Sequence, residues 1–378
     1  MARVEIFCRV IDNFGDIGVC WRLARQLVVE QGASVRLWLD HLETLAPMAK
    51  GVQGDSDRQW IAEVEVCRWA SAFQGGDPDW PDIVIEGFGC GVPEAHAVRL
   101  ARRAHPPRWI ILEYLSAEAW VDDHHAMPSP HPKWGTPRHF FFPGFGERSG
   151  GLLREHDLLA RRDAFGAAAC RQYWQSRGID DSPPETFSVS VFAYPGAPVK
   201  ALLDRLQAPQ GLPAGRSHSL AAFAPGELAD RMLEGTRALT RGGRLTVCRL
   251  PFVAQPEFDE MLWASDFNIV RGEDSFVRAQ WAARPFVWHI YPQADDAHQV
   301  KLDAFLDRYC GAMSPVLAAA VRALWTGFNR RPDGCLDAWP QVVTHWHEWQ
   351  RHARAWSGQL ARQTDLASRL AAFCRDPL

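Results

Sequence analysis

Strand-like and helix-like segments alternate along this chain in two successive series, and this alternation constrains the fold more than any other feature. An apolar, β-rich segment at 4–10 precedes a helical stretch at 15–29, and further strand-like segments follow at 34–39, 64–69, 82–86, 109–114 and 139–145. After a linker-like stretch at 178–185, a second alternation runs from 186 to 290. Strands that alternate with helices of this length are typical of βαβ units on a parallel sheet. The sequence therefore predicts two doubly wound α/β halves followed by helices, with one or two long Trp-rich helices over 335–374.

Composition and charge exclude several classes of protein. Of the 378 residues 47% are hydrophobic and 23% charged, which is ordinary for a folded protein and excludes disordered and fibrous chains. No apolar run approaches the ~18 residues that cross a bilayer, and the N-terminus reads as a strand and a loop instead of a signal peptide. We therefore expect no membrane partner.

Arginine dominates the basic residues, but the charge balance argues against nucleic acid as a partner. Lys and Arg total 41, Asp and Glu total 45, and the net charge is −4, whereas nucleic-acid binders usually carry a clearly basic face. Nine scattered cysteines show no CxxC spacing, so neither a disulfide framework nor a zinc site is predicted. Free thiols in a reducing cytoplasm are the expectation.

The first candidate site is the loop at 11–18, which follows the first strand and opens the first helix. Gly15 and Gly18 allow a ligand to approach the backbone closely. Asp12 and Asp16 could bind a cation or accept a proton, or one of them could only cap the helix. Because one helix has one N-cap, capping does not account for both acids.

The second candidate site is the segment 271–276, which follows the strand FNIV and leads into a helix. Backbone N–H groups at a helix start bind anions, phosphate above all, and Ser275 adds a hydroxyl donor. Glu273 can accept hydrogen bonds from sugar hydroxyls while the amides of Asp274 and Ser275 face the phosphates. The alternative is an acidic first turn that only complements the helix dipole.

Two other patterns are weaker. The glycine run at 87–91 follows a strand, but its spacing is GxGxG and not the dinucleotide-binding GxGxxG, so a tight turn is the better interpretation. His124 and His125, and also His345 and His347, have no cysteine or carboxylate at a recognisable ligand spacing. Surface or capping histidines are expected there, and no metal site.

Several segments together resemble the family of protein-arginine rhamnosyltransferases that modify bacterial elongation factor P. They are VIDNFGDIGVCWRLARQL from residue 10, EYLSAE at 113–118, MPSP at 127–130, PFVAQPEFDEML at 251–262 and RGEDSFVRAQWAARPFVWHIYPQ at 271–293. The resemblance implies an α/β glycosyltransferase B fold, with two Rossmann-like domains facing a cleft and C-terminal helices returning to the N-terminal domain. The acceptor-binding domain would span 1–178 with a helix at about 352–378, and the nucleotide-sugar domain 185–350.

The resemblance also implies the reaction. An inverting, cytoplasmic enzyme of this family moves L-rhamnose from dTDP-β-L-rhamnose to a guanidine nitrogen of one arginine of elongation factor P, which activates that factor for rescue of polyproline-stalled ribosomes. It needs no cofactor and no metal. A guanidinium is a poor nucleophile because its charge is delocalised and its pKa is above 12, so a carboxylate must orient it and take its proton. Asp12 and Asp16 would fill these roles, with Asp16 favoured as the base.

The remaining predicted site residues belong to the donor. The diphosphate would contact Glu273, Asp274, Ser275 and Tyr291. The base and sugar would contact Phe192, Tyr194, Phe252, Gln255, Asn13, Phe14 and Gly15. In the second domain the aromatic side chains could stack on thymine and Gln255 could bind its edge, although core packing is an equally good interpretation of Phe192, Tyr194, Phe252 and Gln255.

Three alternatives stay open on the residues alone. One is an inverting glycosyltransferase B enzyme with another nucleotide sugar and a small-molecule or glycan acceptor. Another is a non-catalytic binding protein for nucleotides or RNA, in which the paired aspartates would have no role. The third is a nicotinamide oxidoreductase, which the missing fingerprint disfavours.

Overall fold

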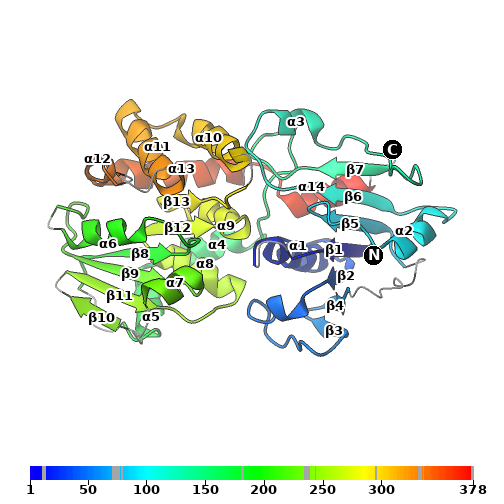
Figure 1. Cartoon of the computed structure of the whole chain (residues 1–378), viewed down its shortest axis with the longest axis horizontal. Coiled ribbons are helices and arrows are strands. Elements are labelled where there is room, and N and C mark those ends of the chain that lie inside the picture. The colour runs from blue at the N-terminus through cyan, green and yellow to red at the C-terminus, as the bar shows by residue number, and fades with distance from the viewer. Residues whose placement is uncertain are drawn as a thin grey trace. The chain divides into compact units, whose positions relative to one another are not determined.

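The chain forms two compact α/β units. The computed structural model describes residues 1–10, 14–69, 77, 80–179, 183–208, 210–233, 239–242, 244–293, 296–330, 334 and 336–375 (Figure 1). Unit 1 comprises Met1–His156 and Arg362–Leu378, and unit 2 comprises Asp157–Ala361. The predicted α/β class with parallel sheets is confirmed.

Unit 1 contains a sheet of seven strands in the order β3-β4-β2-β1-β5-β6-β7, which Figure 1 shows from bottom to top. Its pairs are parallel except for β3 with β4. The order reverses between β1 and β5, and ligands of doubly wound sheets bind at such a switch point, beyond the carboxyl ends of the strands. The strands are β1 (Arg3–Cys8), β2 (Ser34–Leu39), β3 (Arg58–Ile61), β4 (Val64–Arg68), β5 (Ile83–Gly87), β6 (Arg108–Leu112) and β7 (Arg138–Phe141).

Helix α1 (Gly15–Gln31) follows β1 and buries an apolar stripe in the main core of unit 1. It ends where Gly32 adopts a left-handed φ of 62°, and the Gly32 N–H donates to the carbonyl of Val28. The C-terminal helix α14 (Leu366–Arg375) packs on α1 through Leu366 and Leu370. Unit 1 also contains the 3-10 turn η1 (Leu42–Thr44) and the helices α2 (Glu94–Ala101) and α3 (Trp120–His124).

Unit 2 contains a second sheet, of six strands in the order β10-β11-β9-β8-β12-β13 (Figure 1). Only β10 with β11 is antiparallel among its described pairs, and the switch point lies between β8 and β12. The strands are β8 (Thr186–Val191), β9 (His218–Phe223), β10 (Leu239–Gly242), β11 (Leu245–Arg249), β12 (Phe267–Arg271) and β13 (Phe286–His289). The helices are α4 (Leu158–Ala164), α5 (Ala167–Gln175), α6 (Val199–Gln207), α7 (Glu227–Met232), α8 (Gln255–Ala264), α9 (Asp274–Ala282), α10 (Ala297–Cys310), α11 (Pro315–Asn329), α12 (Trp339–Thr344) and α13 (Trp346–Ala361).

The structure divides the chain at residues 156 and 361, whereas the sequence suggested about 178 and about 352. The first difference arises because α4 and α5 pack on α9 and α8. In particular, the Trp174 indole donates to the Ala264 carbonyl over 3.2 Å. The second arises because α13 buries its tryptophans in unit 2, where the Trp356 indole donates to the Gln280 amide over 2.7 Å.

Within the described residues, no helix is long and apolar enough to cross a membrane. The described cysteines are all free thiols, as the sequence predicts.

Candidate functional site

The first candidate site lies at the start of α1, directly beyond the carboxyl end of the central strand β1. Asp16 is in the first turn of α1 and is only 2% exposed, a position where the helix dipole stabilises a negative charge. Phe14 and Gly15 are half-buried at this helix start. Asp12 and Asn13 lie outside the described residues. The structure therefore locates one acid of the predicted pair, and its partnership with Asp12 stays a prediction.

The glycine run at 87–91 begins with the last residue of β5, where Gly87 packs closely against α1 and β1. A Cβ on Gly87 would lie 2.8 Å from the Cys20 Sγ of α1 and 3.0 Å from the Phe7 carbonyl of β1. Gly89 and Gly91 have φ values of 62° and 77°, in the left-handed region, as a tight turn requires. The run is thus a packing and turn element of unit 1, in keeping with the interpretation that its spacing favoured.

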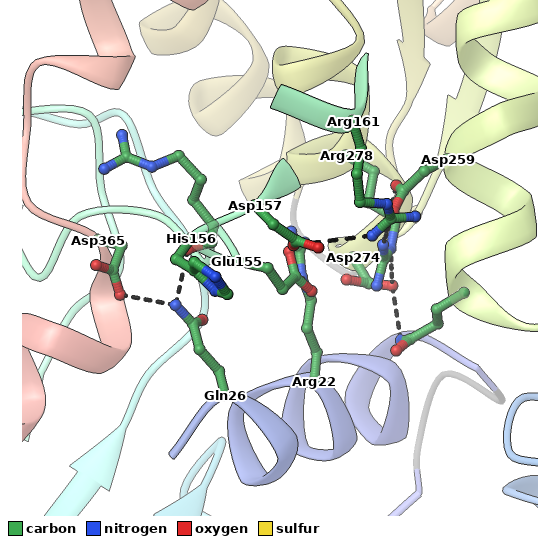
Figure 2. Close-up of polar contacts among 12 residues, drawn as sticks. Arg22, Gln26, Glu155, His156, Asp157, Arg161, Asp259, Asp274, Arg278 and Asp365 are labelled. Atoms are coloured by element: carbon green, nitrogen blue, oxygen red, sulfur yellow. Dashed lines mark hydrogen bonds and ion pairs between the residues drawn. The ribbon is translucent and has the colours of Figure 1, made fainter. Parts of the chain in front are cut away.

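A group of polar contacts that was not predicted from the sequence joins α1 to Glu155 and Asp365 (Figure 2). Arg22 is 1% exposed and forms a bidentate pair with Glu155, with Nε to Oε1 at 2.8 Å and Nη2 to Oε2 at 2.7 Å. One turn on, the Gln26 amide donates to the Arg154 carbonyl over 2.7 Å and to Asp365 over 2.9 Å. We call these contacts the α1 clamp. It holds against α1 both the segment where the chain leaves unit 1, after residue 156, and the segment where it returns, at residue 362.

The second candidate site lies in unit 2, at the carboxyl ends of β8, β12 and β13. Phe192 and Tyr194 follow β8, Arg271 ends β12, and Tyr291 follows β13. The Arg271 guanidinium carbon lies 4.3 Å from the centre of the Phe192 ring and 4.8 Å from that of Tyr194, and the Tyr194 ring is 5.3 Å from the Tyr291 ring. The structure thus brings together three of the predicted donor residues, two of them in direct contact with a cation.

Arg271 opens the predicted segment 271–276, but no ligand contact was predicted for it, although its position offered a signal. It is the last residue of a buried strand and directly precedes the GEDS segment. Cation–π contacts with two rings hold a guanidinium in place. Arg271 therefore places a fixed positive charge at this edge of the sheet.

His289 supports the same cluster from β13. The Tyr194 backbone N–H donates to the His289 Nδ1 over 3.2 Å. Burial, with a smaller contribution from the charge of Arg271, lowers the pKa of His289 to about 4. His289 is therefore neutral at physiological pH, with Nδ1 as acceptor, so it orients the backbone of Tyr194 without adding charge.

The GEDS segment leads from the end of β12 into helix α9, as the sequence predicted. Glu273 occupies the N-cap position, and Gly272 before it has a left-handed φ of 59°. The Ser275 hydroxyl accepts from the Arg271 N–H over 3.1 Å and donates to the Arg271 carbonyl. This hydroxyl closes the turn between β12 and α9, so the first-turn backbone amides are the groups of α9 that suit an anion.

Asp274 and Gln255 belong to a buried polar network between α8 and α9 (Figure 2). The Asp274 Oδ2 accepts from Gln255 over 3.1 Å and from the Arg278 Nε over 2.8 Å. The Arg278 Nη1 donates to both oxygens of Asp259, at 2.9 and 2.8 Å. The Gln255 amide, predicted to bind the base, is 6% exposed and points into this network. Its contact with the base stays a prediction.

Two predicted aromatic side chains are exposed. Phe252 is 38% exposed just beyond β11, and Tyr291 is 45% exposed just beyond β13. Both follow strands whose carboxyl ends lie at the site edge of the sheet. Exposed rings there are suited to stacking on a flat ligand. The described residues contain no group of three or more His, Cys, Asp or Glu side chains placed to hold a metal ion.

Two doubly wound α/β units in one chain are the architecture of the glycosyltransferase B fold. The solved structure of the spinosyn rhamnosyltransferase SpnG shares this fold, with a TM-score of 0.54 over 98% of this chain and 99% of that chain at 10% identity. The chain belongs to the EarP family, the elongation factor P (EF-P) rhamnosyltransferases, which matches residues 4–375. This membership confirms the resemblance seen in the sequence.

Relatives cover the whole chain. It is 45% identical to the protein-arginine rhamnosyltransferase of Pseudomonas putida and 41% identical to that of Pseudomonas aeruginosa, over 100% of each chain. A solved structure that describes EarP-mediated arginine glycosylation of translation elongation factor EF-P is 34% identical, with a TM-score of 0.66 over 100% of both chains. The chain is therefore a glycosyltransferase, and the non-catalytic and oxidoreductase alternatives are excluded.

Proposed function

We propose that this enzyme transfers L-rhamnose from dTDP-β-L-rhamnose to a guanidine nitrogen of one arginine of elongation factor P, with inversion at the anomeric carbon. Family membership supports the reaction class. The observation that carries the donor assignment is Arg271, held between Phe192 and Tyr194 beside the first turn of α9. A fixed guanidinium next to a helix start suits the diphosphate of a nucleotide sugar.

In the donor step, the bond between the anomeric carbon and the diphosphate oxygen breaks, and dTDP leaves with the electron pair. Arg271, the first-turn amides of α9 and the Tyr291 hydroxyl would stabilise the charge that develops on that oxygen. These groups supply the positive potential without a metal. Phe252 would stack on thymine, and Glu273 would accept hydrogen bonds from sugar hydroxyls.

In the acceptor step, the new bond joins a terminal guanidine nitrogen to the anomeric carbon, on the face opposite the departing dTDP. A carboxylate must hold the guanidinium and remove one proton as this bond forms. Asp16 is the described residue that fits this role, with Asp12 as its predicted partner. The product is an α-linked rhamnosyl arginine. We place the reaction in the cytoplasm, because the described free thiols suit a reducing compartment.

The intact mass of elongation factor P, after incubation with the enzyme and dTDP-rhamnose, tests the reaction. We expect a gain of one deoxyhexose with the natural enzyme and no gain with Asp16→Asn, while calorimetry shows near-normal dTDP binding by this variant. Glu94→Gln, an exposed acid in the first turn of α2, is the matched control and should transfer normally. Full transfer by Asp16→Asn would contradict the mechanism. Unmodified elongation factor P with sugar found on a glycan or small molecule instead would favour a different acceptor.

Donor binding is tested separately by titration with dTDP-rhamnose. Arg271→Met removes a charge-assisted contact worth about 1.5–3 kcal/mol, so the affinity should fall roughly 10- to 100-fold. Glu273→Ala and Ser275→Ala should also weaken binding, the latter by loosening the turn that Ser275 closes. Unchanged titration curves for all three variants would refute the placement of the diphosphate.

A further inference from the structure

Unit 2 contains a cavity of about 580 Å³ that the proposed reaction does not use. Thr186 and Ser188 of β8, Leu220 of β9 and Asp266 before β12 line it on one side, and α5 lines it on the other. Because these strands are parallel, their amino ends lie at the edge of the sheet opposite the donor residues. Five residues of β12 separate the two edges, or about 16 Å at ~3.3 Å per residue.

The charged groups of the cavity are mostly positive. Three guanidinium groups, those of Arg171, Arg216 and Arg284, line it together with one carboxylate, that of Asp266. Asp266 is held within the protein: it accepts from Arg216 over 2.9 Å and from the Ser188 hydroxyl over 3.1 Å. The remaining positive charge belongs to Arg171 and Arg284.

Arg284 is the cavity cation whose charged form is disfavoured by burial. Its Nη2 donates to a neutral acceptor, the Trp263 carbonyl, over 2.9 Å. Burial lowers the pKa of the Arg284 guanidinium, and the nearby charge of Arg354 lowers it further, although Asp266 partly compensates. An anion bound beside Arg284 would offset the cost of this burial.

Two further features supply polar contacts for a ligand. The Thr186 hydroxyl is buried and has no hydrogen-bond partner within the described structure, which is costly for a protein unless a ligand or water satisfies it. Helix α5 begins at Ala167, so its first backbone N–H groups lie at the cavity wall, where Gly166 leaves open space.

The rest of the wall is apolar and partly aromatic. It includes the rings of Phe165 and Trp174 and the side chains of Ile179 and Leu220. Cavities of about 300–1,000 Å³ with an apolar lining and few convergent polar groups are typical small-molecule sites. We propose that this cavity binds a small anionic molecule with an aromatic or apolar body and a carboxylate or phosphate group, the oxyanion contacting Arg284 and the body packing on Trp174.

The test uses two fluorescent dyes on the full chain. Anilinonaphthalene sulfonate combines an aromatic body with an oxyanion, and N-phenylnaphthylamine has a similar body without the charge. We expect saturable binding of the anionic dye at one site that excess dTDP does not compete for. Arg284→Met should weaken the anionic dye at least about tenfold, since a charge-assisted contact is lost, and should change the neutral dye by less than about twofold.

Arg231→Met on α7 is the matched control, because Arg231 is exposed and does not line the cavity; it should leave both dyes unchanged. Ala167→Trp adds bulk to the cavity wall without removing a charge, so it should weaken the binding of both dyes. This variant tests the cavity independently if Arg284→Met does not fold. Equal binding of the anionic dye by Arg284→Met and Arg231→Met would overturn the proposal. Displacement by dTDP, or non-saturating binding at many sites, would overturn it as well.

Discussion

Replacing Arg278 with methionine should destabilise unit 2 strongly, because Arg278 pairs with both carboxylates of the α8–α9 network, those of Asp259 and Asp274. Its side chain is 2% exposed, against 4% for Asp259 and 12% for Asp274. Methionine keeps much of the length and apolar surface but removes the charge and three hydrogen bonds. Breaking a buried ion pair by removing one partner costs about 3–5 kcal/mol. We expect a loss of that size, since two buried carboxylates remain.

The surface offers a matched control for this substitution. Arg231 pairs with Glu227 four residues earlier on α7, the same spacing as Arg278 with Asp274, but these side chains are 66% and 59% exposed. Exposed pairs of this kind contribute about 0.3–0.5 kcal/mol. Urea unfolding followed by tryptophan fluorescence gives the overall loss, and hydrogen exchange of peptides from α8 and α9 locates it. A loss below about 1 kcal/mol for Arg278→Met, or a loss equal to that of Arg231→Met, would refute the reasoning.

Three further outcomes are expected. The pKa of His289 is lowered from 6.5 to about 4, so as the pH falls the unfolded chain binds a proton before the folded chain does. The free energy of unfolding should therefore be highest above pH 6.5 and fall by up to about 3 kcal/mol towards pH 4. In thermal unfolding, His289→Gln should reduce this dependence on pH. Arg22→Met should cost about 2–4 kcal/mol by leaving Glu155 half-buried without its cation, with faster hydrogen exchange over 152–156 and 362–366. Gly87→Ala should cost about 1–3 kcal/mol through overpacking, and Cys20→Ala should recover part of it.

Much of the fold could be predicted because its signals are local. Apolar strands that alternate with helices mark parallel sheets, and the central strand β1, predicted over 4–10, spans Arg3–Cys8. The edge strands β3 and β10 were missed. The sequence of β3, RQWI, is short and partly polar, as edge strands often are, so it resembles a loop. It is a strand because it pairs with β4, and its own residue pattern does not indicate this.

Element boundaries between the two units were harder to predict, because helix propensity does not say which core a helix joins. Trp346, Trp349 and Trp356 indicate a buried helical stripe, yet only the fold shows that they pack in unit 2, where the Trp349 indole donates to the Tyr309 hydroxyl over 3.0 Å. The following helix α14 has its own apolar stripe and packs on α1 instead. The change of unit between them falls at Ala361.

The site was predictable as a set of positions and less so as a set of bonds. The GEDS segment does open a helix at the carboxyl end of a buried strand, as the sequence predicted. The partners of its polar groups could not be deduced, because Gln255 and Asp274 are 19 residues apart on different helices. The stacking of Arg271 on Phe192 likewise joins two strands that only the sheet order brings together.

The Asp274 network is compatible with the proposal that an acidic segment binds the diphosphate. The Asp274 carboxylate would oppose a phosphate if it faced the ligand, but it accepts hydrogen bonds from Gln255 and Arg278 within the protein. Its charge is therefore balanced on the inner side of α9, while the first-turn amides and Arg271 set the potential at the outer end of the helix. Arg278→Met should consequently weaken dTDP-rhamnose binding although Arg278 touches no ligand in the proposed site, and Asp274→Asn in the same background should restore part of the affinity. Donor titration that leaves Arg278→Met unchanged while Arg271→Met loses affinity would show that the charge of Asp274 does not reach the ligand.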